Sequence, residues 1–187
     1  KDWDLWIKDA ATGGETQLTK DGIENYGYAT DNAGWRKSDK PILLWSPDSK
    51  KIATFRQDQR HVSDMYLAST KVGAPELQQW KYPLPGDEKV IQIERIIIDT
   101  ENSEIIPLKI PQDPRRGTLC DDISCSGAFD DNQWSEDSKE LAFVSTSRDH
   151  KVAKFRIADA TTGEVREVFE EKVNTQYESG QGSINWK

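Results

Sequence analysis

The sequence contains little of what several function classes require. No window approaches the roughly 18 consecutive apolar residues of a membrane-spanning helix. The 25 Lys and Arg residues are outnumbered by 33 Asp and Glu residues, which gives a formal net charge of −8 over 187 residues. Nucleic-acid binding normally requires a basic surface. We therefore expect no membrane span and no nucleic-acid partner.

Sequence patterns of catalysis and of cofactor binding are also missing. There is no Gly-x-Ser-x-Gly nucleophile turn and no glycine-rich phosphate loop ahead of a helix. His150 lies in a polar segment typical of a hairpin turn, which favours a turn residue over a general base. Neither histidine has finger-like spacing to a cysteine. The sequence predicts no catalytic residue, no cofactor and no metal in this chain.

The two cysteines, Cys120 and Cys125, are separated by four residues. They could form a local disulfide in an exported protein, or remain free thiols in the cytosol. Their spacing leaves both states open.

What the chain does contain is a ten-residue phrase that occurs twice. Residues 45–54 (WSPDSKKIAT) return 89 positions later as 134–143 (WSEDSKELAF). Each copy has a Trp, a polar turn and an alternating strand pattern. A shorter echo relates 7–13 (IKDAATG) to 157–163 (IADATTG), and its Asp and Thr-Gly are typical of a hairpin turn. Recurring units of this kind, about 40 to 50 residues long, predict the blades of a β-propeller.

We predict an all-β chain that is a portion of a propeller, with about three four-stranded blades of which the middle one is degenerate. The predicted boundaries are the end of one blade at 1–21, blades at 41–72 and 130–171, a degenerate blade at 88–110, the start of another at 183–187, and insertions at 22–40, 73–87 and 111–131. Function usually lies in such insertions. We expect Trp45 and Trp134 to pack between blades. Open strand edges would favour a homo-oligomer or strand exchange.

Three segments together resemble the amino-terminal β-propeller of the dipeptidyl peptidase IV-like serine peptidases: 44–53, 55–58 and 82–87. In that family a Trp-Ser-Pro blade is followed, after an insertion, by a Tyr-Pro-x-x-Gly segment. The resemblance covers nearly the whole chain. It implies an exopeptidase that removes dipeptides from peptide amino termini, with its triad on a carboxy-terminal α/β-hydrolase domain outside this chain. The propeller would then be a non-catalytic portion that gates access of the peptide substrate. The expected location is extracytoplasmic, periplasmic or secreted, with the cytoplasm as the alternative.

The resemblance also suggests substrate-binding residues. Classical members bind the free amine of the substrate with a Glu-Glu pair that precedes the Trp-Ser-Pro blade, and this chain has no adjacent acids there. Asp31 with Asn32 is the nearest polar substitute, because an ammonium group requires a carboxylate; a simple turn is the alternative. Tyr26 and Tyr28 from the same segment, and Phe129 ahead of the second phrase, complete the predicted substrate-binding set.

Two other function classes remain open at this point. One is a protein-interaction or periplasmic scaffold propeller with no peptidase attached. The other is a carbohydrate-binding β-domain that would use exposed aromatic side chains such as Tyr26, Tyr28 and Trp35.

Overall fold

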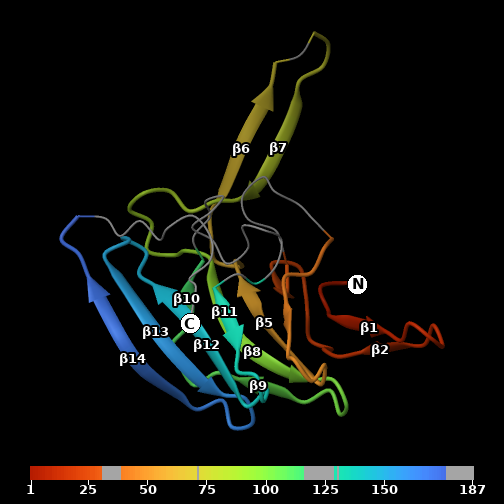
Figure 1. The fold of residues 1–187 in the computed structure, drawn as a ribbon. Coiled ribbons are helices and arrows are strands. Elements are labelled where there is room, and N and C mark those ends of the chain that lie inside the picture. The colour runs from red at the N-terminus through yellow and green to blue at the C-terminus, as the bar shows by residue number, and fades with distance from the viewer. Residues whose placement is uncertain (31–38, 71, 116–128, 130, 176–187) are drawn as a thin grey trace.

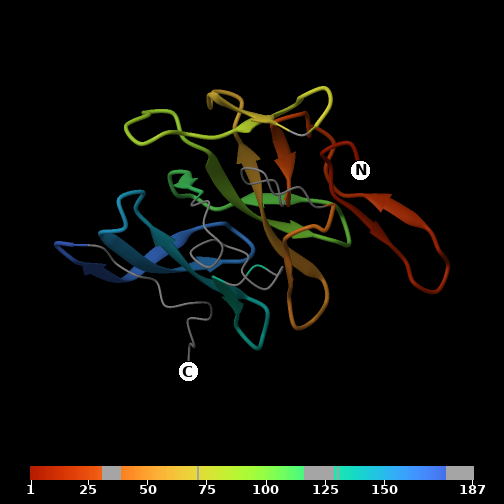
Figure 2. The same cartoon turned by 90° about the horizontal axis from the view of Figure 1, so that it is seen from above.

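The regular elements of the protein are all β-strands. The computed structural model describes residues 1–30, 39–70, 72–115, 129 and 131–175. Within these ranges the chain forms two larger antiparallel sheets and two hairpins, without a helix. One hairpin lies beside the sheets and the other projects away from them (Figures 1 and 2). The predicted all-β class is confirmed.

The first sheet is built around a long central pair of strands. Its members are β3 (Tyr26–Tyr28), β4 (Leu44–Trp45), β5 (Lys51–Asp58), β8 (Gln92–Asp99), β9 (Ile105–Pro107) and β10 (Asp113–Pro114). Strands β5 and β8 pair along their whole length, from Lys51 opposite Asp99 to Asp58 opposite Gln92. Both β3 and β4 pair with the far edge of β5, while β9 and β10 pair with the far edge of β8. The six strands therefore lie in four adjacent rows, and each of the two outer rows contains two short strands.

The second sheet contains four strands in chain order. They are β11 (Asn132–Trp134), β12 (Glu140–Thr146), β13 (Val152–Asp159) and β14 (Val165–Lys172). This is the sequence of elements predicted for 130–171, namely a Trp strand, a turn, an alternating strand and a closing hairpin.

The middle of the chain differs from the expected arrangement. Segments 41–72 and 88–110 were expected to form separate blades, but β5 and β8 pair with each other in one sheet. Between them lies a hairpin of β6 (Asp64–Ser69) and β7 (Glu76–Lys81), which projects from the body (Figure 1). The 89-residue spacing of the phrase therefore spans one sheet and an inserted hairpin. The total number of blades stays a prediction.

The isoleucine run of β8 explains why this strand is central. Ile96, Ile97 and Ile98 are each 1% exposed or less, because both faces of the first sheet are covered. A strand that is buried on both faces has a continuous apolar sequence rather than an alternating one. One face packs on the second sheet, and the other packs on the hairpin of β1 (Trp6–Lys8) and β2 (Glu15–Gln17) through Leu5 and Leu18.

The two tryptophans of the phrase have different environments. Trp134 is 8% exposed and packs between the sheets, where its Nε1–H donates to the carbonyl of Leu44 at 3.2 Å. Trp45 is 44% exposed. The prediction that both pack between blades is therefore met by Trp134 and not by Trp45, because no described strand covers the position that Trp45 faces.

A buried arginine joins the two sheets. The side chain of Arg95, on β8, is only 3% exposed; its Nε donates to Asp113 Oδ2 at 2.9 Å and its Nη2 to Asp131 Oδ2 at 2.6 Å. The same Nη2 donates to the carbonyl of Val144 on β12 at 3.0 Å. Burial opposes the charge of Arg95, but the neighbouring carboxylates raise its pKa above the ordinary value. The guanidinium thus stays charged inside the interface.

Candidate functional site

The predicted residues Tyr26 and Tyr28 lie together on one face of the first sheet. Residues two apart on a strand point to the same face, and the register of β3 on β5 places Tyr28 opposite Arg56. The guanidinium of Arg56 lies 4.4 Å from the ring centroid of Tyr26 and 5.6 Å from that of Tyr28. Arg60 covers the ring of Tyr26 at 3.8 Å. The two tyrosines therefore belong to a cluster of aromatic and cationic groups.

Two carboxylates hold Arg56 in place. Its Nε and Nη2 donate to Glu94 Oε2 at 3.0 and 2.5 Å, and its Nη1 donates to Asp21 Oδ2 at 2.9 Å. The hydroxyl of Tyr28 donates to Asp21 Oδ1 at 2.6 Å. We call these residues, together with Tyr26, the Arg56 cluster. It ties the segment after β2 to β3, β5 and β8, so the cluster fixes the orientation of the chain immediately before Asp31.

The protonation states of the cluster follow from this geometry. Burial, and then the hydrogen bond to Asp21, raises the pKa of Tyr28 above its ordinary value. Burial likewise raises the pKa of Tyr26. For Arg56, burial opposes the charge, while hydrogen bonds and charge from Glu94 raise the pKa above its ordinary value. The tyrosines are thus neutral hydrogen-bonding groups at neutral pH and Arg56 is a fixed cation.

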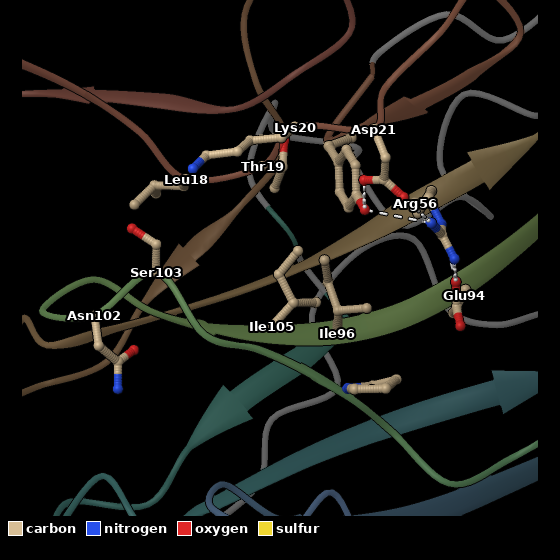
Figure 3. Close-up of a pocket in the computed structure, with 12 residues that line it drawn as sticks. Leu18, Thr19, Lys20, Asp21, Arg56, Glu94, Ile96, Asn102, Ser103 and Ile105 are labelled. Atoms are coloured by element: carbon tan, nitrogen blue, oxygen red, sulfur yellow. Dashed lines mark hydrogen bonds and ion pairs between the residues drawn. The ribbon is translucent and has the colours of Figure 1, made fainter.

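A cavity of about 540 Å³ lies beside the cluster (Figure 3). Its apolar lining includes Leu18, Ile96 and Ile105, while Arg56, Asp21 and Glu94 lie together at one side. This volume is within the range of small-molecule sites. Among the described residues that line the cavity there is no histidine or cysteine, so these residues offer a binding surface without a histidine-activated nucleophile.

The structure separates Phe129 from the two tyrosines. Its side chain is 1% exposed and packs on Phe55 with ring centroids 5.5 Å apart, in the core between the two sheets. Tyr28 belongs to the core on the opposite face of the first sheet. Phe129 and the tyrosines therefore lie on opposite faces of the first sheet, because the alternation of β5 directs Phe55 and Arg56 to opposite faces. The substrate-binding role of Phe129 stays a prediction.

The remaining predicted residues, Asp31 and Asn32, lie outside the described residues, as do Trp35 and both cysteines. Thr30, the residue before Asp31, is held by a side chain from a distant part of the sequence. Arg115, which is 7% exposed, donates from Nη1 to the carbonyl of Thr30 at 2.8 Å and also to Gln57 Oε1. Its guanidinium lies 5.4 Å from the ring centroid of Phe55. Arg115 thus fixes the backbone at the start of the predicted amine-binding segment.

Sequence reasoning missed the arginines that organise this region. Arg56 lies in the segment that supports the family resemblance, but its partner Glu94 is 38 residues away, and no local pattern reveals such a pair. Arg115 has no motif spacing either. The burial of Arg115 beside the first sheet could have identified this residue, but that burial is known only once the sheet itself is known.

No group of three or more His, Cys, Asp or Glu side chains suited to a metal ion occurs in the part of the chain that the structure describes. Over the same residues, no helix is long and apolar enough to cross a membrane.

Solved structures of other proteins contain a similar fold. A putative dipeptidyl aminopeptidase IV from Bacteroides ovatus matches with a TM-score of 0.64 and 20% identity, over 94% of this chain and 25% of the other. The dipeptidyl peptidase 4 of Porphyromonas gingivalis matches with a TM-score of 0.71 and 16% identity, over 94% and 24%. At these identities the likeness shows the fold alone, which is the β-propeller expected from the sequence.

Curated relatives share sequence with most of the chain. A probable dipeptidyl-aminopeptidase B of Aspergillus clavatus is 25% identical over 186 residues, which is 87% of this chain and 18% of the relative. Its counterpart in Penicillium rubens is 28% identical over 167 residues, or 80% and 17%. The chain thus spans less than a fifth of the length of these relatives. The family model described as the dipeptidyl peptidase IV N-terminal region matches residues 1–186. The chain therefore belongs to the family of dipeptidyl peptidase IV N-terminal regions.

Proposed function

We propose that this chain is the non-catalytic, substrate-gating propeller portion of a dipeptidyl peptidase IV-like serine exopeptidase. The observation that carries the proposal is the family match over residues 1–186, together with a fold in which sheets pack face to face. The sequence has no nucleophile turn, which supports placing the chemistry on a carboxy-terminal α/β-hydrolase domain. That domain and a peptide substrate are the proposed partners, and an extracytoplasmic location is proposed with them.

The absence of chemistry is tested on the chain alone. We expect no hydrolysis of a glycyl-prolyl nitroanilide, whereas the full-length protein releases nitroaniline and is blocked by a serine-directed inhibitor. Turnover by the isolated chain that the same inhibitor abolishes would contradict the assignment. A full-length protein with no peptidase activity would instead favour the scaffold propeller.

Within this function we propose that Asp31 pairs with the free amine of the substrate, with Asn32 beside it. Support comes from the two anchors of the preceding residues: Tyr28 in the Arg56 cluster and the Thr30 carbonyl on Arg115. Both fix the backbone from which Asp31 extends. A carboxylate–ammonium hydrogen bond contributes about 1.5 to 3 kcal/mol, which corresponds to a change in affinity of roughly 10- to 100-fold.

The measurement is steady-state kinetics of the full-length enzyme with Asp31→Ala. We expect KM to rise by about 10-fold or more while kcat changes little, because the amine contact forms in the ground state and persists in the transition state. Glu136→Ala, an exposed acid in the turn between β11 and β12, is the matched control and leaves both constants unchanged. An unchanged KM in Asp31→Ala would refute this role.

The carbohydrate-binding alternative receives no support from Tyr26 and Tyr28, the two of its named aromatic residues that the structure describes. Tyr28 is 6% exposed, and the ring of Tyr26 lies against two guanidinium groups. Sugar stacking requires an open ring face, which the buried Tyr28 does not offer and for which Arg56 and Arg60 compete at Tyr26.

A further inference from the structure

The cavity of about 540 Å³ beside the Arg56 cluster has an apolar floor. On β9, Ile105 is half-buried and Pro107 is exposed, and both line the cavity. Leu18 and Ile96 line it too, and they belong to a buried core on which Ile105 packs. Because buried cores are close-packed, this floor keeps its shape. Apolar groups of a ligand would be removed from water there.

One end of the cavity carries a net negative charge. The single guanidinium of Arg56 faces two carboxylates, those of Asp21 and Glu94, which leaves one negative charge in excess. Arg56 donates twice to Glu94 Oε2, whereas Glu94 Oε1 accepts no hydrogen bond from any described residue. The side chains of Glu94 and Asp21 are 27% and 60% exposed. A cation can therefore pair with Glu94 here without displacing Arg56.

The other end of the cavity carries a cation. Lys20 is exposed, and among the described residues its ammonium has no hydrogen-bond or ion-pair partner. Figure 3 shows the Lys20 side chain extending away from Asp21, toward Leu18 and Ser103. The Ser103 hydroxyl also lacks a hydrogen-bond partner within the described ranges. Lys20 and Ser103 thus offer two donors to a carboxylate.

The spacing of the two ends follows from strand β8. Glu94 and Ile98 are four residues apart on this strand, which corresponds to about 13 Å. Ile98 lies opposite Ile105, and Ser103 precedes Ile105 by two residues. An extended chain of about four residues spans a similar distance. The cavity thus matches a short peptide with free termini, both in length and in the sign of the charge at each end.

We propose that this cavity binds a short extended peptide of about four residues, with free termini and apolar side chains. The ammonium group of the peptide pairs with Glu94 at the negative end. Its carboxylate accepts hydrogen bonds from Lys20 and Ser103, and its side chains pack on Ile105. The site is separate from the proposed amine site at Asp31, and it does not depend on the proposed peptidase function.

Photoaffinity labelling of the full-length protein tests the proposal. The probe is the peptide Ala-Leu-Ala-Leu with photoreactive analogues of leucine, and a serine-directed inhibitor prevents its hydrolysis. We expect saturable labelling close to Ile105 and Pro107, located by mass spectrometry. Unlabelled Ala-Leu-Ala-Leu competes at a concentration roughly fivefold lower than its N-acetyl or carboxamide form, because each of these forms lacks one terminal charge. Tetraglycine, which has no apolar side chains, and the dipeptide Ala-Leu, which cannot reach both ends, also compete less well.

A pair of lysine variants isolates the charge at the carboxylate end. Lys20→Met weakens competition by the free peptide roughly fivefold but leaves competition by the carboxamide form unchanged, since that form has no carboxylate for Lys20. The matched control is Lys8→Met, because Lys8 is also exposed and lacks a hydrogen-bond partner among the described residues; it changes neither value.

Three results would overturn the proposal. The first is labelling that is absent from β9 or confined to other segments. The second is competition by the charge-blocked forms that equals that of the free peptide. The third is a Lys20→Met variant that behaves like Lys8→Met.

Discussion

Replacing Arg95 with methionine is the sharpest test of how the two sheets are held together. Methionine keeps much of the length and apolar volume of the side chain but removes the charge and every donor. Asp113, which is 8% exposed, then loses its 2.9 Å contact with Arg95 and keeps the longer contact with Arg156 Nη1 at 3.9 Å, while Asp131 loses a 2.6 Å contact. Removing one partner of a buried ion pair costs roughly 3 to 5 kcal/mol. Because folded domains are stable by about 5 to 15 kcal/mol, Arg95→Met is expected to remove a large share of the stability.

Urea unfolding followed by tryptophan fluorescence measures this cost. The matched control is Arg166→Met, because Arg166 pairs with Glu140 at 3.4 Å on the surface, with side chains 59% and 50% exposed. Exposed pairs contribute about 0 to 1 kcal/mol. A second variant, Arg95→Met with Asp113→Asn, removes one of the stranded charges, and we expect it to recover part of the lost free energy of unfolding. The Ser145 hydroxyl, which donates to Asp113 Oδ2 at 2.7 Å, can still donate to the side-chain oxygen of the introduced amide.

One result would refute this reasoning. If Arg95→Met lowers the free energy of unfolding by no more than Arg166→Met does, the Arg95 network does not stabilise the interface. A double variant less stable than Arg95→Met would show that the stranded charge is not the cause of the loss.

Two further predictions concern a glycine in a hairpin turn and the loss of stability at acidic pH. Gly163→Ala is expected to destabilise by about 1 to 3 kcal/mol more than Gly13→Ala, as measured by urea midpoints. Both glycines have positive φ, 70° and 75°, but a Cβ on Gly163 would lie 2.3 Å from the Pro107 carbonyl oxygen, while one on Gly13 would meet only the Lys8 side chain at 4.0 Å; equal losses would contradict the close approach. The hydrogen bonds from Arg60 hold the pKa of Asp58 below its ordinary value. A carboxyl with a lowered folded pKa stabilises the fold above its unfolded pKa of about 3.9, and that contribution is lost as pH falls through the folded value. Asp58→Asn should therefore lose less stability than the parent chain between about pH 6 and pH 3, and identical pH profiles would count against the pairing.

The sequence predicts the elements of the fold better than their partners. Alternation and hairpin residues identify the strands of 130–171 in order, since those signals are local. The pairing of β5 with β8 was missed, because the 89-residue spacing fits two blades as well as it fits one sheet with an inserted hairpin. The β5–β8 pairing and the burial of residues 96–98 on both faces distinguish the two arrangements, and both are properties of the assembled sheets.

The candidate site divides in the same way. Tyr26 and Tyr28 are brought together because they are two apart on one strand, which a sequence can indicate. Phe129 lies on the opposite face of the first sheet from the tyrosines, because the second sheet covers the side of β5 that carries Phe55. Which side is covered cannot be known from the sequence. The partners of Arg56 and Arg95 are contributed by separate strands and loops, so no local pattern could have placed them.

The chain can be divided into two fragments at the inserted β6–β7 hairpin. The backbone leaves the first sheet at Asp58 and returns at Gln92, and these two residues are direct partners. At the hairpin tip Val72 is fully exposed, and Gly73 has open space around it. A cut between them would leave β5 on one fragment and β8 on the other, still paired from Lys51–Asp99 to Asp58–Gln92. The tip is thus the natural place to split this protein into two pieces that reassemble through their longest shared ladder.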